Sequence, residues 1–253
     1  MKHSTITDKK RVMHKLWILI FWIFIWQLIY MLVGRDIYVP SPIDVLMRLR
    51  EMLFLPRFWS IMSYSIYRVI VGMLLSVVMG IILGVIASLN AYVYALLHPL
   101  VVAIRATPVM SFIIIALIWF SSGNVPIFIC FLMCFPIIWT NVIEGIDNVD
   151  FRLLEMAKIY CVKQWIVLKK IYIPAMTPYL FAACITALGL GWKVSVAAEV
   201  LSHPRNAIGS EIYSAKVYLD SRELFAWTLV VILLSFLFES IFGQFMKRRK
   251  KGI

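Results

Sequence analysis

Six long runs of apolar residues alternate with polar segments along the chain. A helix that crosses a bilayer needs about 20 mostly apolar residues, because each residue adds only about 1.5 Å to its length. The runs cover residues 16–33, 66–89, 100–120, 125–143, 171–200 and 224–246. The pattern therefore predicts an all-α integral membrane protein with about six transmembrane helices.

The segments between these runs suggest how the chain is organised. Pro42 follows Ser41 in a polar stretch, and proline is favoured in the first turn of a helix, so an amphipathic helix is expected there. The expected segments are a basic N-terminal tail (1–15), a first transmembrane helix (16–33), an extracytoplasmic segment with the amphipathic helix (34–60), a transmembrane domain (60–246) that contains a polar loop (144–170), and a basic C-terminal tail (247–253).

Composition and charge support a membrane protein. Apolar residues make up 62% of the chain, against roughly 45–50% in soluble domains. The 25 Lys and Arg outnumber the 13 Asp and Glu, but they gather in both tails and in the loop 144–170, beside apolar runs. That placement argues for contact with membrane lipid and against nucleic acid. Because cytoplasmic segments carry excess Lys and Arg, both termini are expected in the cytoplasm.

Small residues recur every four positions along the second apolar run. At this spacing they form one narrow stripe on a helix, which lets a neighbouring helix approach closely. We therefore predict tight helix packing, within the chain or between chains, along the stripe Gly72, Ser76, Gly80, Gly84 and Ser88.

The polar loop 144–170 has a helical pattern of its own. Asp150 is placed to cap a short helix, and Ala157 falls on its apolar side. This apolar side is expected to comprise Leu153, Leu154, Ala157, Tyr160 and Cys161. Such a helix can rest on the lipid interface or dock into a groove of a soluble partner, and the pattern alone leaves both open.

The same loop resembles a known family motif. Glu155-Met156-Ala157, then Cys161, then the run from Ile171 to Pro174, is similar to the "EAA" loop of ATP-binding-cassette (ABC) importer permeases. The spacing matches throughout, with Met, Cys and Ile where the family has Ala, Gly and Leu at positions 156, 161 and 173. Since the family glycine lies in a turn, a cysteine there in a left-handed conformation costs on the order of 1 kcal/mol.

Further stretches resemble the nitrate, sulfonate and taurine branch of that family. They are Val39–Pro42, Tyr67–Gly72, Arg105–Pro108, Gly191–Lys193 and Ala197–Glu199. The resemblance covers most of the chain, and it implies the type I ABC importer permease fold and a location in the bacterial inner cell membrane.

The resemblance also implies partners and a mechanism. The chain is expected to form a homodimer, to couple with two copies of an ATPase subunit through the cytoplasmic loop 150–174, and to receive solute from an extracytoplasmic binding protein. The chain has no phosphate-binding loop of the Walker type, so ATP and Mg²⁺ are expected on the ATPase, with no cofactor and no catalytic or metal site here. The residues implied in coupling are Glu155, Met156, Ala157, Cys161, Ile171 and Pro174.

Charged residues inside apolar runs are costly in a bilayer and are candidates for function. Arg105, Lys193 and Glu199 are candidates for the solute pathway, whereas Arg68 is interpreted as reaching the membrane interface. The two pathway cations suit a small anion such as an aliphatic sulfonate, taurine or nitrate.

Two other functions remain as alternatives. One is a permease of the same fold that imports pyrimidine precursors, and the other is a membrane-embedded enzyme, which would need a polar catalytic cluster. The chain's four histidines, however, are scattered. A secondary transporter would need more spans or an inverted repeat. The four cysteines, Cys130, Cys134, Cys161 and Cys184, are interpreted as small buried hydrophobic residues.

Overall fold

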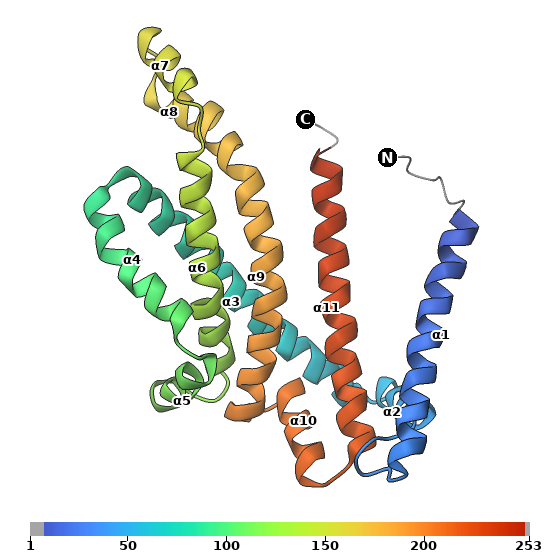
Figure 1. Cartoon of the computed structure of the whole chain (residues 1–253). Helices are drawn as coiled ribbons and strands as arrows, with labels where there is room; N and C mark the ends of the chain where they lie inside the picture. Colours follow the sequence, from blue (N-terminus) through green and yellow to red (C-terminus); the bar gives the residue numbers. More distant parts are fainter. Residues whose placement is uncertain (1–7, 251–253) are drawn as a thin grey trace. The chain divides into compact units, whose positions relative to one another are not determined.

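The computed structural model describes residues 8–250, and it describes the side chains of residues 13–14 and 17–241. Every regular element in this part of the chain is helical (Figure 1). In chain order the elements are α1 (Asp8–Val33), α2 (Pro42–Leu53), α3 (Pro56–Leu89), α4 (Ala91–Ala106), α5 (Val109–Trp119), α6 (Val125–Asp147), α7 (Phe151–Ile159), α8 (Gln164–Val167), the π-helical turn η1 (Leu168–Tyr172), α9 (Ile173–Ser202), α10 (Ile208–Val217) and α11 (Ser221–Lys250).

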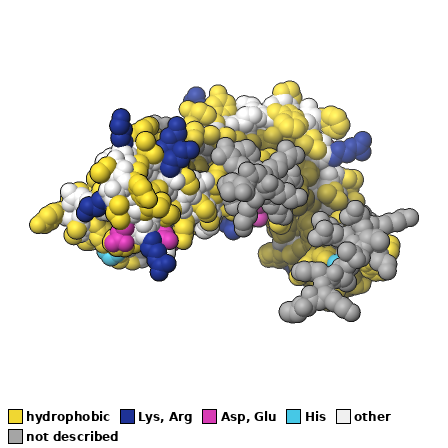
Figure 2. Space-filling model, turned by 90° about the horizontal axis from the view of Figure 1, so that it is seen from above, with side chains coloured by type: hydrophobic (Ala, Val, Ile, Leu, Met, Phe, Trp, Pro, Cys, Tyr) yellow, Lys and Arg dark blue, Asp and Glu magenta, His cyan; other side chains and the backbone are white. Residues whose placement is uncertain are grey.

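Four helical stretches among the described residues are long and apolar enough to cross a membrane. They are Pro56–Leu89, Val125–Asp147, Gln164–Ser202 and Ser221–Ile241. The bent pair α4 and α5 adds a fifth candidate, and the shorter apolar stretch Trp17–Val33 of α1 corresponds to the first predicted span. Seen from above in Figure 2, hydrophobic side chains cover much of the surface that is not grey. Large apolar side chains along the helices, such as Ile118 and Phe236, are exposed, as expected for helices that face lipid. The all-α membrane fold class is therefore confirmed.

The third predicted span, residues 100–120, is not one helix. Its residues belong to α4 and α5, which meet at an angle of 107°. Thr107 between them is extended, with φ −84° and ψ 134°. Pro108 explains the break, because a proline disfavours helical geometry in the preceding residue and donates no backbone hydrogen bond of its own.

The chain divides into two compact units. The first comprises residues 1–59 and 211–230, and the second comprises residues 60–210 and 231–253. In the first unit, Ser41 caps the expected amphipathic helix α2 by accepting a hydrogen bond from the Asp44 backbone at 3.1 Å. Arg48 of α2 forms an ion pair of 2.9 Å with Glu223, and Phe58 stacks on Trp227.

The core of the second unit is the pair α6 and α9, which run side by side (Figure 1). Buried side chains of α5 join this pair in one cluster. The cluster consists of Ile113, Ala116, Val125, Ile129, Val194 and Ala198. Because α6 is buried along most of its length, it is the central helix around which the other helices of this unit pack.

The small-residue stripe of α3 lies against α6. A Cβ atom added to Gly80 would come within 2.7 Å of Ile138, and one added to Gly84 within 2.8 Å of Val142. At Gly72 the same atom would meet Cys130 and the Ile127 carbonyl oxygen, each at 2.7 Å. The Ser76 hydroxyl donates to the Phe131 carbonyl at 3.0 Å, and Ser88 bonds within its own helix at Gly84. The stripe therefore brings two helices of one chain together.

We expect Gly80→Ala to destabilise the protein, because the new methyl group would overlap Ile138 of the neighbouring helix. Overpacking of this kind costs about 1–3 kcal/mol. The melting temperature in detergent should fall by about 5 °C. Gly123→Ala is the matched control, since nothing lies within 4 Å of its added Cβ atom. Equal melting temperatures for the two variants would contradict the close contact between α3 and α6.

Candidate functional site

The segment between α6 and α9 contains the helix predicted in the polar loop. α7 spans Phe151–Ile159, and the Asp150 carboxylate accepts a hydrogen bond from the Arg152 backbone at 2.9 Å. The predicted cap is therefore confirmed. Figure 1 shows α7 and α8 beyond the ends of α6 and α9, where the two long helices present them together.

The turn after α7 is left-handed at Cys161, whose φ is 48°. The Cys161 backbone donates to the Lys158 carbonyl at 3.1 Å, and the Val162 backbone donates to the Ala157 carbonyl at 2.9 Å. This pair of bonds closes a Schellman turn, in which glycine is usual. A cysteine thus adopts the geometry that the family motif assigns to glycine. The Cys161 side chain is exposed, so its interpretation as a buried residue was wrong, whereas Cys130 and Cys134 are buried.

The surface of α7 is more apolar than the sequence pattern suggested. Ala157 is buried at 6% exposure, and Leu154 is half-buried. Leu153 and Tyr160, both expected on the buried side, are exposed, as are the Glu155 and Met156 side chains. The exposed apolar side chains of this helix and its turn are Phe151, Leu153, Met156, Ile159 and Tyr160. Such a surface is typical of a site that another molecule covers.

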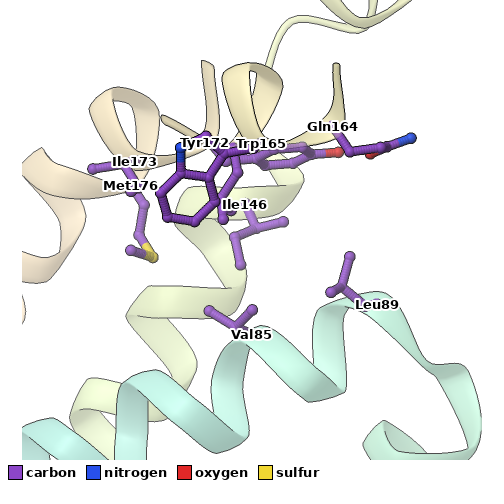
Figure 3. Close-up of a pocket in the computed structure, with 9 residues that line it drawn as sticks. Val85, Leu89, Ile146, Gln164, Trp165, Tyr172, Ile173 and Met176 are labelled. Carbon is purple, nitrogen blue, oxygen red and sulfur yellow. The ribbon is translucent and has the colours of Figure 1, made fainter. Parts of the chain in front are cut away.

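The helix continues from α8 through η1 into α9, so that Ile171 and Pro174 lie where the loop joins the long helix. A cavity of about 360 Å³ lies beneath this junction. In Figure 3, Trp165 and Tyr172 lie on one side of the cavity and Val85 and Leu89 of α3 on the other. The cavity is lined mainly by apolar side chains, and it separates α8 and η1 from the end of α3.

A second feature is the exposed face of α9. Lys193 is exposed although Trp192 and Val194, its neighbours in sequence, are buried. The residues in line with it are small or polar instead of bulky. They are Ala182, Thr186, Gly189 and Ala197, spaced three or four positions apart as one helical face requires. The sequence spacing could have revealed this face, but only Lys193 was singled out.

Arg105 lies in the last turn of α4, next to the bend at Thr107 and Pro108, and its side chain is exposed. Within the described part of the chain, neither Arg105 nor Lys193 makes a hydrogen bond or an ion pair. Among the described residues, these two cations of membrane helices have no ion-pair partner. Glu239 of α11 lies beside the same face of α9, since its Oε1 atom would be 3.7 Å from a Cβ atom added to Gly189.

Glu199, the third charged candidate, lies in a different environment. Its side chain is 0% exposed, and its Oε1 atom accepts a hydrogen bond from Arg68 at 2.9 Å. The Arg68 side chain is itself only 7% exposed. Arg68 was interpreted as reaching the membrane interface, and this interpretation was wrong because Arg68 is buried beside Glu199. The sequence gives no sign of this ion pair, since the two residues lie 131 positions apart.

Comparison with known proteins identifies the family. The sequence model of the binding-protein-dependent transport system inner membrane component matches residues 76–251 of the chain. The chain belongs to this family. The matched residues include α7 with its turn, and they include the exposed face of α9 with Lys193.

The permease is similar to importers of small solutes in bacteria. It is 24% identical to the taurine transport system permease protein TauC of Escherichia coli, over 85% of this chain and 80% of that protein. It is 27% identical to the nitrate import permease protein NrtB of Synechococcus elongatus, over 70% of this chain and 67% of that protein. These relatives support the sulfonate, taurine and nitrate branch of ABC importer permeases.

The solved structures support the same fold. The permease aligns with a chain of the MetNI methionine ABC transporter in an inward facing conformation, at a TM-score of 0.64 and 14% identity, over 74% of this chain and 93% of that chain. The family and the candidate spans make the permease a multi-pass membrane protein and a component of a transport system. This assignment favours transport over a membrane-embedded enzyme.

Proposed function

We propose that the permease forms the pathway of an importer for a small anion, such as an aliphatic sulfonate, taurine or nitrate. The observation that carries this proposal is Lys193, an exposed cation on the small-residue face of a membrane-spanning helix. A charge at this position is costly against lipid but favourable beside water and an anionic solute. The taurine and nitrate relatives support the same class of solute.

Transport requires a second subunit to supply energy. In our proposal the loop 150–174 lies in the cytoplasm, with both termini, and contacts an ATPase that binds ATP and Mg²⁺. The exposed apolar side chains of α7, which include Met156 and Ile159, supply the contact surface. Two permease copies and two ATPase copies complete the assembly, since Ala182, Thr186 and Lys193 on the small-residue face of α9 are exposed in a single copy and a second copy would enclose them.

An amino-sulfonate is favoured among these solutes by one further observation. The Glu239 carboxylate lies beside Gly189, one helical turn from Lys193 along the same face of α9. An ammonium group and a sulfonate group on one small molecule could therefore face a carboxylate and a cation together. A simple inorganic anion would use only the cation.

We expect a strain without the permease to lose growth on an anionic sulfur or nitrogen source that the intact strain uses. Lys193→Met should lower the uptake rate of that solute about tenfold or more, because a cation in the pathway is removed. The panel to measure comprises taurine, ethanesulfonate, nitrate, and cytosine as a neutral compound. A loss of cytosine uptake alone would contradict the anion assignment.

Glu239→Gln separates the two solute classes within the same assay. Loss of taurine uptake with normal ethanesulfonate uptake would support the amino-sulfonate, and equal losses would contradict it. Lys216→Met is the matched control, because it removes an exposed cation that lies on α10, outside the candidate spans. Its uptake rates should equal those of the unmodified permease.

A further inference from the structure

The turn between α9 and α10 is held by side chains that bind three successive carbonyl oxygens. The Ser210 hydroxyl donates to Pro204 at 2.8 Å. The Arg68 guanidinium donates to Arg205 at 2.9 Å and to Asn206 at 3.1 Å. Because these donors come from α3 and α10, the backbone of the turn is fixed to two other helices.

Glu199 completes this network from the end of α9. Its Oε1 atom binds Arg68, and its Oε2 atom accepts from the Ser65 hydroxyl at 2.9 Å and from the Gly209 backbone at 3.1 Å. The Ser65 hydroxyl in turn accepts from the Ile208 backbone at 3.0 Å. Each polar group of Glu199 and Ser65 therefore has a partner, which allows the network to be buried.

The turn itself is strained. His203 has a φ of 46° and Asn206 a φ of 50°, so two residues other than glycine adopt left-handed geometry within four positions. Such geometry persists only where the surrounding structure enforces it, and it concentrates at functional sites. Here the surrounding structure is the buried network of Arg68 and Glu199.

The strained turn presents polar side chains outward. The side chains of His203, Arg205 and Asn206 are exposed, while Pro204 and Ala207 are buried. The exposed side chains include no large apolar residue that could enter a bilayer. A rigid polar surface with a cation suits a folded partner of opposite charge better than mobile lipid headgroups.

We propose that the turn His203–Asn206 is a docking element for an acidic patch on the solute-binding protein. Arg205 is the contact cation, and Arg68 and Glu199 are positioning residues that act through the turn. This inference rests on the proposed function, because the proposed orientation puts the end of α9 on the outer side of the membrane, where that protein acts.

The test uses the permease with its ATPase in lipid nanodiscs and the loaded binding protein encoded with them. The ATPase rate is measured against the concentration of binding protein. Arg205→Glu should raise the half-saturating concentration about tenfold and leave the maximal rate unchanged, since it places like charges together. The matched control is Arg50→Glu, an exposed arginine of α2 whose reversal changes the net charge equally and should shift the concentration less than about twofold.

A second variant tests the positioning residues. Arg68→Lys keeps a positive charge beside Glu199 but lacks the guanidinium fork that binds two carbonyl oxygens. It should raise the half-saturating concentration without lowering the maximal rate. Trypsin should also cleave after Arg205 about tenfold faster in this variant, with unchanged cleavage after the exposed Arg35, because only the turn is released.

Several results would overturn the inference. If Arg205→Glu and Arg50→Glu raise the half-saturating concentration equally, the effect comes from the net charge of the permease and not from the turn. A shift for Arg205→Glu that occurs in anionic nanodiscs and vanishes in phosphatidylcholine would assign the contact to lipid. Arg68→Lys could instead lower the maximal ATPase rate while the half-saturating concentration and the trypsin cleavage stay unchanged. In that case Arg68 does not position the turn for docking, and its role is structural only. If the ATPase rate of the unmodified transporter does not depend on the concentration of binding protein, the proposed function itself is refuted.

Discussion

Replacing Ala157 with aspartate should separate the permease from its ATPase while leaving the permease in the membrane. Ala157 is the one residue of α7 that is buried, at 6% exposure. An aspartate there would carry a charge into a packed contact, at a cost of several kcal/mol. The protein can avoid this cost by detaching α7 alone. Because α7 lies beyond the ends of α6 and α9 (Figure 1), the two long helices can stay packed when it detaches. Transport and co-purified ATPase should both fall below about one tenth.

The measurement compares the amount of permease with the amount of co-purified ATPase in the same membranes. Ala157→Ser is the matched control, because it changes the side chain by one atom and adds no charge. If α7 instead served as a lipid anchor, Ala157→Asp would lower the amount of permease, and the remaining copies would still retain the ATPase. Normal uptake and normal co-purification in this variant would remove α7 from the coupling mechanism.

A companion variant separates the packing of α7 from its contact with the partner. Ile159 is 78% exposed, so Ile159→Asp places the same charge on the outer surface of α7. Trypsin cleavage after the exposed Arg152, whose neighbours in sequence are unchanged in both variants, should accelerate in Ala157→Asp, where α7 detaches, and stay unchanged in Ile159→Asp. Loss of the ATPase in both variants would then show that the exposed apolar surface forms the contact.

Local features of this protein could be predicted from the sequence because their causes lie within a few residues. The Asp150 cap requires only that a carboxylate precede a helical pattern, and it is observed. The same holds for Ser41 before α2. The small-residue stripe of α3 could be predicted because its residues lie on one helix. The sequence could not indicate that α6 is the helix that packs against the stripe.

Other features depend on contacts between distant parts of the chain. Arg68 was expected at the interface because an arginine on an apolar helix usually extends toward water, yet its partner Glu199 lies 131 positions away. The small-residue face of α9 has a signal in its spacing, but that this face is not covered follows only from the packing of α6 against the other side of the helix. The break at Thr107 had a local signal in Pro108, but the surrounding residues are apolar enough to suggest one continuous span.

The second large effect is expected for Glu199→Ala, which should strongly destabilise the permease. The substitution leaves the Arg68 guanidinium buried without its counter-charge, and it removes the acceptor of the Gly209 backbone. Removing one member of a buried ion pair costs about 3–5 kcal/mol. The melting temperature in detergent should fall by about 10 °C, and the amount of permease in the membrane should fall with it.

The double variant Arg68→Leu with Glu199→Leu tests whether the unpaired charge is the cause. Removing both charges abolishes the penalty of an uncompensated guanidinium, so the double variant should be more stable than Glu199→Ala. It should not reach the stability of the unmodified permease, because the carbonyl oxygens of Arg205 and Asn206 lose their donor. A reversed pair, Arg68→Glu with Glu199→Arg, restores opposite charges but gives these carbonyls no donor at position 68 and the Gly209 backbone no acceptor at position 199. Full recovery by the reversed pair would show that charge alone matters, and it would refute the requirement for directed hydrogen bonds.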